Sequence, residues 1–170
     1  MNANQFPQNA GPRLGRIKTA SRILSVLISV CFVIGAPYEL AVYLGWLPLP
    51  EGRKILVSPH QLYASATEMP AAVLALALVR LGLAVFCFLI LYKLFRLYER
   101  GVLFSAKNVL YIRFLGYYLM IDWVALYQLE YLSHQMDLSM TQPITGLMII
   151  FVAWIMDEAR KIQEEQDLTV

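Results

Sequence analysis

The sequence predicts an all-α fold: an integral membrane bundle of four transmembrane helices with both termini cytoplasmic. Composition is the first reason. Of the 170 residues, 59% are hydrophobic and only 15% are charged, whereas a soluble domain carries about 25% charged residues to face water. The second reason is that the apolar residues gather in four segments, and a helix of ~20 apolar residues can cross a bilayer. The third is an uneven distribution of lysine and arginine between the loops.

The four spans differ in how clearly the sequence marks them. In the first, Pro37 predicts a kink in the outer half. The fourth is the weakest, because its apolar core, Ile144–Met156, falls short of ~20 residues and needs Pro143 and earlier residues to reach spanning length. We expect the spans at about residues 23–47, 69–92, 109–132 and 136–156.

Local signals mark the ends of the middle helices. Ser65 and Glu68 have capping-box spacing before the second helix. Gly101 can terminate that helix, because glycine readily adopts a left-handed conformation. Ser105 is a suitable N-cap for the third helix. The second and third helices should therefore form a tight helical hairpin around residues 101–108.

Three regions follow from these boundaries. Residues 1–16 are polar and contain proline and glycine, so we expect a disordered cytoplasmic N-terminus. Residues 17–163 should form the membrane domain, with the last helix continuing to about Gln163. Residues 164–170 then form a cytoplasmic tail. The loop from Pro48 to Ala64 holds three prolines, so we expect it to be irregular and outside the membrane.

The basic residues set the predicted orientation. Cytoplasmic loops of membrane proteins carry an excess of lysine and arginine, and the loops on the opposite side here contain only Arg53 and Lys54. An anionic membrane leaflet then becomes the natural partner of the basic side, and the lipid bilayer the main partner of the protein. The basic residues on the predicted cytoplasmic side are Arg13, Arg16, Lys18, Arg22, Lys93, Arg96, Arg100, Lys107, Arg113, Arg160 and Lys161.

A charge lies inside each of the two middle spans. Arg80 is in the second and Asp122 in the third, each about ten residues from the outer end of its helix. Because the two helices are antiparallel neighbours, both charges should lie at a similar depth. An unpaired charge at the bilayer centre costs ~2.5–3.5 kcal/mol or more. We therefore predict an Arg80–Asp122 ion pair inside the bundle.

Glu39, in the first span, is a second intramembrane acid. Two interpretations of these charges stay open. Arg80 and Asp122 can fix the packing of helices without taking part in chemistry, or they can form a solute site, a proton site or a switch, with Glu39 as a further member. Glu130 lies near the outer interface, and we expect it to be solvated.

Other kinds of site find no support. Cys31 and Cys87 are far apart and lie in apolar runs, so we interpret both as small membrane-buried side chains. His60 and His134 fall in separate loops without ligand spacing. No nucleophile elbow, phosphate-binding glycine loop or HExxH motif is present. A net charge of +2 is too small to suggest direct binding of nucleic acid. We therefore expect no enzyme activity, no cofactor and no metal.

Two stretches resemble a known family. LYKLFRLYERGVLFSAKNV, at residues 91–109, and the terminal EEQDLTV are similar to the bacterial family called domain of unknown function 2975. The resemblance implies a small four-span protein of the inner membrane, often paired with a small helix-turn-helix regulator of the Xre type. It implies no activity. The residues that carry it are Gly101, Phe104, Ser105 and Asn108 in the hairpin, and Glu165, Asp167, Leu168, Thr169 and Val170 in the tail.

These observations lead to two main hypotheses. In the first, the chain is a non-enzymatic inner-membrane sensor or regulatory anchor, which holds a cytoplasmic DNA-binding regulator through the hairpin and the tail. In the second, it is a small proton-linked transporter or channel subunit that uses Arg80, Asp122 and Glu39; four spans without an internal repeat would then require a homo-oligomer. A purely structural membrane subunit is the third alternative.

Overall fold

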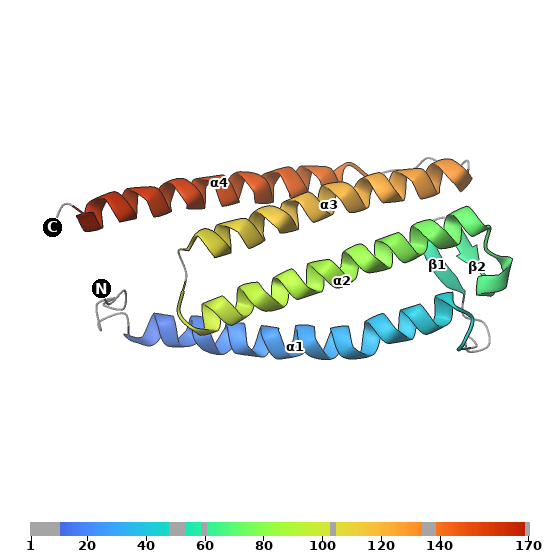
Figure 1. The fold of residues 1–170 in the computed structure, drawn as a ribbon, viewed down its shortest axis with the longest axis horizontal. Helices are drawn as coiled ribbons and strands as arrows, with labels where there is room; N and C mark the ends of the chain where they lie inside the picture. Colours follow the sequence, from blue (N-terminus) through green and yellow to red (C-terminus); the bar gives the residue numbers. More distant parts are fainter. Residues whose placement is uncertain (1–10, 48–53, 59–60, 103–104, 134–138, 169–170) are drawn as a thin grey trace.

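The computed structural model describes residues 11–47, 54–58, 61–102, 105–133 and 139–168. Four long helices dominate it, with a small hairpin and a short 3-10 turn between the first two (Figure 1). The helices are α1 (Gly11–Tyr43), α2 (Ala71–Glu99), α3 (Ala106–Ser133) and α4 (Thr141–Leu168); the hairpin strands are β1 (Ile55–Ser58) and β2 (Gln61–Tyr63), and the 3-10 turn is η1 (Ala66–Glu68).

All four helices are long and apolar enough to cross a membrane, the predicted weak fourth span included. Their outer faces expose many large apolar side chains, which water would penalise and lipid would not. The fold is that of a multi-pass membrane protein.

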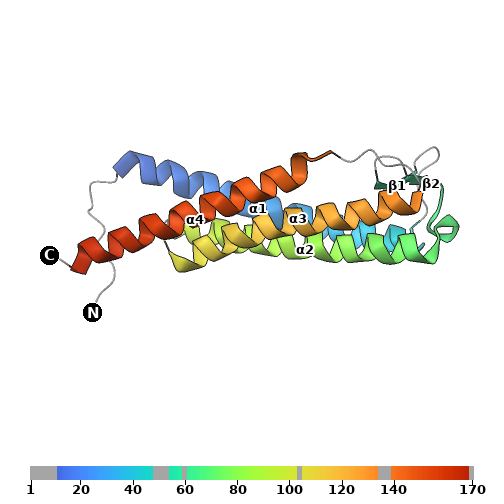
Figure 2. The same cartoon turned by 90° about the horizontal axis from the view of Figure 1, so that it is seen from above.

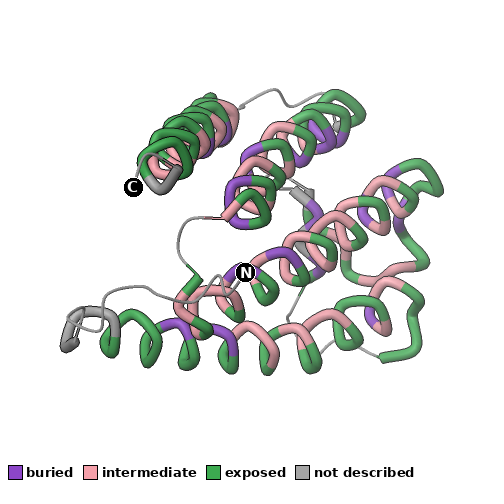
Figure 3. Tube along the Cα trace, turned by 60° about the vertical axis from the view of Figure 1, so that its left-hand side comes forward, coloured by how far each residue is buried: buried purple, intermediate pink, exposed green. Residues whose placement is uncertain are grey.

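Each helix packs against the next one in sequence, so the four form an open row rather than a closed ring (Figures 1 and 2). Along the helix axes, the start of α1 and the end of α4 lie on the same side as the α2–α3 turn. Buried residues gather on the faces between neighbouring helices, and the outward faces are exposed (Figure 3). The row has two tight helical pairs, α1–α2 and α3–α4, joined by fewer contacts between α2 and α3.

The limits of α1 differ from the predicted ones at both ends. The helix begins at Gly11, so residues 11–16 are helical rather than disordered; residues 1–10 lie outside the described residues. It ends at Tyr43 instead of residue 47, because Gly45 adopts a left-handed conformation with φ 69°. The amide of Trp46 then bonds to the carbonyl of Ala41 at 2.8 Å, which closes a Schellman motif and ends the helix.

The expectation of an irregular loop at residues 48–64 was wrong for its second half. Strands β1 and β2 pair antiparallel, with Ile55 opposite Tyr63. Ile55 and Val57 are 7% and 3% exposed. These side chains alternate along the strand and face the helices, so the hairpin is held by packing that the proline count does not reveal.

The predicted capping box closes a separate turn instead of starting α2. Ser65 precedes η1 and makes no side-chain capping bond there. Glu68 reaches back to the amide of Ala64 at 3.1 Å. The long helix starts only at Ala71, after Pro70, whose carbonyl accepts the bond from Leu74. Proline fits this position because it has no amide hydrogen to satisfy.

The turn between α2 and α3 has the predicted glycine and cap. Gly101 has φ 79°, and the amide of Val102 bonds to the carbonyl of Leu97 at 3.1 Å in a second Schellman motif. Ser105 Oγ accepts the amide of Asn108 at 3.2 Å, which is the expected N-cap bond of α3.

Two glycines bring α3 and α4 into close contact. A Cβ on Gly116 would lie 2.8 Å from the carbonyl oxygen of Gly146, and a Cβ on Gly146 would lie 2.9 Å from the carbonyl oxygen of Gly116. Small residues at such crossings let the backbones approach, and dispersion contacts then hold helices together where lipid surrounds them. Ala153, further along α4, is fully buried.

Candidate functional site

Arg80 and Asp122 meet between α2 and α3, as the spacing predicted. Arg80 Nε donates to Asp122 Oδ1 at 2.9 Å, and Arg80 Nη2 donates to Asp122 Oδ2 at 3.3 Å. The Asp122 side chain is 8% exposed and that of Arg80 is 26% exposed. A two-pronged arginine–carboxylate contact fixes orientation as well as charge, so this pair sets the relative position of the two helices.

The sequence did not predict the second partner of Arg80. Its Nη1 donates to the carbonyl oxygen of Val57 at 3.0 Å, and Val57 is in strand β1. Arg80 follows the first residue of α2 by nine positions, about 14 Å along the helix. The β hairpin therefore reaches down alongside the first turns of α2. One guanidinium connects it to both α2 and α3.

An apolar cluster surrounds this junction. It combines the end of α1, strand β1, the start of α2 and the end of α3, so elements far apart in sequence share one core. Because it excludes water, the hydrogen bonds of Arg80 beside it gain strength. The buried members are Val42, Ile55, Val57, Met69, Val73, Ala77 and Leu129.

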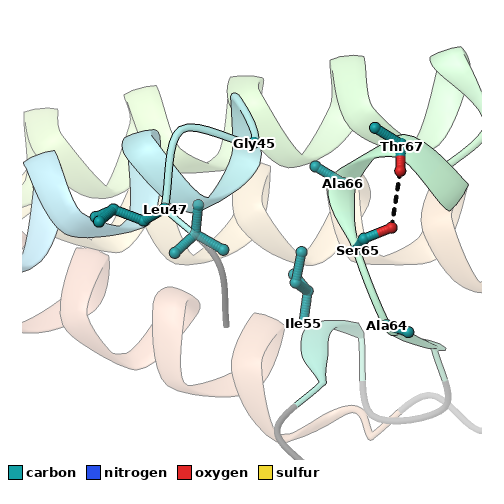
Figure 4. A pocket seen from close by; sticks show the side chains of 8 residues that line it. Gly45, Leu47, Ile55, Ala64, Ser65, Ala66 and Thr67 are labelled. Carbon is teal, nitrogen blue, oxygen red and sulfur yellow. Dashed lines mark hydrogen bonds between the residues drawn. The ribbon is translucent and has the colours of Figure 1, made fainter. Parts of the chain in front are cut away.

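A small cavity lies at the edge of this cluster, between the end of α1 and the segment after the hairpin (Figure 4). Its volume is 130 Å³, below the ~300–1,000 Å³ of typical small-molecule sites. Ser65 and Thr67 provide its polar wall, with their hydroxyl oxygens 2.8 Å apart. No side chain that lines it is charged.

Glu39 does not join the charged pair. Its side chain is exposed on α1, and no ion pair links it to Arg80 among the described residues. Glu130 contradicts the expectation of a solvated acid, because it is 1% exposed. It lies eight residues after Asp122 and so shares that face of α3. This spacing was the signal that could have identified it as buried.

The residues of the α2–α3 turn that carry the family resemblance hold that turn firmly in place. Asn108 is fully buried, and its Nδ2 donates to the carbonyl of Val102 at 2.7 Å. From α1, Lys18 lies over Gly101, where a Cβ would meet its Cε at 2.9 Å. Phe104 lies outside the described residues. Gly101, Ser105 and Asn108 therefore stabilise the turn itself.

The tail is more helical than predicted. Helix α4 continues to Leu168 rather than ending at about Gln163. Asp157 accepts Arg160 Nη2 at 3.0 Å and lies 4.0 Å from Arg113 Nη2 on α3. These contacts hold the base of the tail against α3. Glu165 is exposed, Asp167 and Leu168 are the last helical residues, and Thr169 and Val170 lie outside the described residues.

The comparisons with known proteins agree with the resemblance. The sequence model of a family described as "Protein of unknown function (DUF2975)" matches residues 54–170. The chain belongs to this family. The match includes the β hairpin, Arg80, Asp122, the turn and the tail, whereas α1 with Glu39 lies before it. No curated protein and no solved structure matches the chain.

The donor atoms of the site do not suggest a metal centre. Among the described ranges, no three His, Cys, Asp or Glu side chains gather closely enough to hold a metal ion. What the described residues show at Arg80 and Asp122 is hydrogen bonding and charge pairing between α2, α3 and β1.

Proposed function

We propose that this protein is a non-enzymatic sensor or regulatory anchor in a bacterial inner membrane, with both termini cytoplasmic. In this proposal the β hairpin responds to a change in the envelope or membrane at the outer face. Helices α2 and α3 transmit it, and the turn and tail hold a cytoplasmic DNA-binding regulator of the helix-turn-helix class.

The observation that supports the proposal most is the three-way contact of Arg80. A single guanidinium donates to the hairpin carbonyl of Val57 and to Asp122 on α3. Displacing the hairpin would remove one of these acceptors and leave the guanidinium to rearrange. A buried polar group that loses its partner costs about 1–3 kcal/mol, which is enough to shift a two-state equilibrium roughly fivefold to 150-fold.

In this proposal, the ends of α2 and α3 at their shared turn pass the shift on to the cytoplasmic partner. The two helices lead from Arg80 and Asp122 to the turn at Gly101, which is braced by Asn108 and covered by Lys18. A braced turn transmits a shift of the helices instead of absorbing it by bending. Residues of the turn and tail also carry the family resemblance.

The transporter hypothesis has less support. Both carboxylate oxygens of Asp122 accept hydrogen bonds from Arg80, which is the arrangement of a fixed ion pair. Glu39 lies exposed on α1, and no ion pair joins it to Arg80 among the described residues. A proton pathway would need these groups to follow one another.

The first experiment follows the turn while the junction is changed. In a background with Cys31→Ser and Cys87→Ser, a cysteine replaces exposed Val102, and its labelling rate by a maleimide is measured in membranes. We expect Arg80→Lys to change this rate severalfold, because lysine retains charge but lacks the planar fork. The control is Arg96→Lys, an arginine of the same helix that contacts neither Asp122 nor β1. Equal rates in all three proteins would contradict transmission along α2 and α3.

The second experiment tests the partner. Crosslinked capture from native membranes compares the full chain with one ending at Gln163. Recovery of a DNA-binding protein by the full chain only, with Glu39→Gln as an unaffected control, supports the anchor. Solute or proton flux that Asp122→Asn abolishes, with no protein captured through the tail, would favour the transporter instead.

A further inference from the structure

An apolar groove runs between α1 and α2, along the half of these helices that is nearer the α2–α3 turn. Its volume is 160 Å³. Its walls are almost entirely apolar, so in a membrane it suits the acyl chains of lipid. The side chains that form its walls include Ser29, Phe32 and Val33 from α1, and Phe88, Leu89 and Tyr92 from α2.

Helical spacing places one arginine of each helix towards the end of this groove nearest the turn. The guanidinium carbon of Arg96 is 6.0 Å from the ring centroid of Tyr92, which is part of the wall. Arg22 precedes Ser29 by seven residues, or two helical turns, and so shares its face of α1. Lys18 lies over Gly101, which places Arg22, one turn further along antiparallel α1, close to the level of Arg96.

The charges around this end favour an anion. Arg96 pairs with Glu99 at 3.2 Å, but both side chains are partly exposed, at 47% and 27%. Such exposed pairs contribute little and rearrange easily. Arg22 is exposed and has no acidic partner within the part of the chain that the structure describes. Arg22, with no acidic partner there, and Arg96, whose pair with Glu99 is partly exposed, therefore leave net positive charge at the end of the apolar groove.

We propose that this groove binds one phospholipid with an anionic headgroup. The groove's 160 Å³ takes only part of one acyl chain, between Phe32, Phe88 and Leu89, and the rest of the lipid stays in the bilayer with its phosphate held by Arg22 and Arg96. The apolar lining and the positive charge at one end of the groove decide the occupant. Only a lipid of the membrane itself joins an apolar chain to a phosphate at this depth. The site uses α1, which lies before the matched family region, and it does not depend on the proposed signalling role.

Native mass spectrometry of the full chain tests this site. The protein is reconstituted into nanodiscs of phosphatidylglycerol and phosphatidylcholine in equal amounts, extracted gently, and its retained lipids are counted. We expect one retained phosphatidylglycerol. The double variant Arg22→Gln/Arg96→Gln should lower the preference for phosphatidylglycerol on the order of tenfold or more, since each interfacial cation contributes about 1 kcal/mol. Leu89→Trp, which fills the groove, should reduce retention of both lipids.

Lys107→Gln is the matched control, because it removes a cation at the same end on α3, which does not line the groove. Arg22→Lys/Arg96→Lys retains charge and should retain the lipid. Should the double glutamine variant fail to elute as folded protein, Arg22→Gln alone gives the same reading from an exposed position. Unchanged preference in the glutamine variants, or an equal loss in Lys107→Gln, would overturn the site and indicate a diffuse basic surface.

Discussion

Arg80 donates a hydrogen bond to the backbone carbonyl of Val57, 3.0 Å away and 23 residues earlier in the chain. A side chain inside a membrane helix thus holds an element that the sequence places outside the membrane. The same guanidinium also pairs with Asp122. Removing either acid or base therefore has different consequences, because only Arg80 serves both partners.

Asp122→Asn and Arg80→Gln should both destabilise the protein, and Arg80→Gln should do so more. Arg80→Gln leaves the buried Asp122 carboxylate uncompensated and weakens the bond to β1, whereas Asp122→Asn leaves only the partly exposed guanidinium. Because Arg80 is partly exposed, we expect losses of about 2–3 kcal/mol, at the lower end for a broken buried pair. Thermal unfolding in detergent, followed by gel filtration, measures this order. Greater damage from Asp122→Asn would contradict the role of Val57.

Exchanging the charges tests the same contact in another way. From depth alone, Arg80→Asp with Asp122→Arg should restore the abundance that either single variant loses. The structure changes this expectation, because an aspartate at position 80 offers no donor to the Val57 carbonyl. We expect only partial recovery on a membrane immunoblot. Full recovery would mean that the bond to β1 contributes nothing measurable, and absence of any recovery would argue against the pair.

Gly116→Ala should separate α3 from α4. Its Cβ would lie 2.6 Å from Ile150 Cγ1 and 2.8 Å from the Gly146 carbonyl oxygen, and the backbone cannot move away cheaply. We expect a loss of about 1–3 kcal/mol, as for other overpacked sites. Gly82→Ala is the matched control, since no atom lies within 4 Å of its Cβ position. It should be neutral or slightly stabilising, because alanine favours helix. Equal melting temperatures for the two variants would refute the close crossing.

Gly101→Ala should destabilise the α2–α3 turn through its backbone. A left-handed conformation costs a residue with a Cβ roughly 1–2 kcal/mol, and the methyl group would also meet Lys18 Cε at 2.9 Å. Adding Lys18→Ala removes the second problem and leaves the first. The double variant should therefore recover only part of the loss, as judged by the midpoint of thermal unfolding. Complete recovery would show that contact with Lys18, and not φ, makes glycine necessary.

The proposed orientation is tested by labelling with an impermeant maleimide in the cysteine-free background. Leu62→Cys lies in β2 and Val102→Cys in the turn, and both positions are exposed, at 54% and 39%. We expect intact cells to label Leu62→Cys only, and permeabilised cells to label both. Labelling of Val102→Cys in intact cells would reverse the topology that the basic residues predict.

Some of the candidate site was readable from spacing and some was not. Arg80 and Asp122 could be paired because antiparallel neighbouring helices convert position along the chain into depth. Ser105 and Gly101 could be placed because capping is local. Glu130 was misjudged although it shares the Asp122 face, since proximity to a predicted interface was given more weight than helical spacing. Glu39 was grouped with the pair because it is an acid inside a predicted span without an obvious basic partner, and its side chain is exposed on α1.

The sequence by itself determined the four membrane helices and the ion pair between the middle two. These depend on hydropathy and on the desolvation of charge, both of which act residue by residue. Only the tertiary structure decided that Val57 accepts a hydrogen bond from Arg80, that Gly116 packs against Gly146, and that the four helices form an open row. These are contacts between segments distant in the chain. Their geometry depends on how whole faces pack against one another, and no local pattern encodes that.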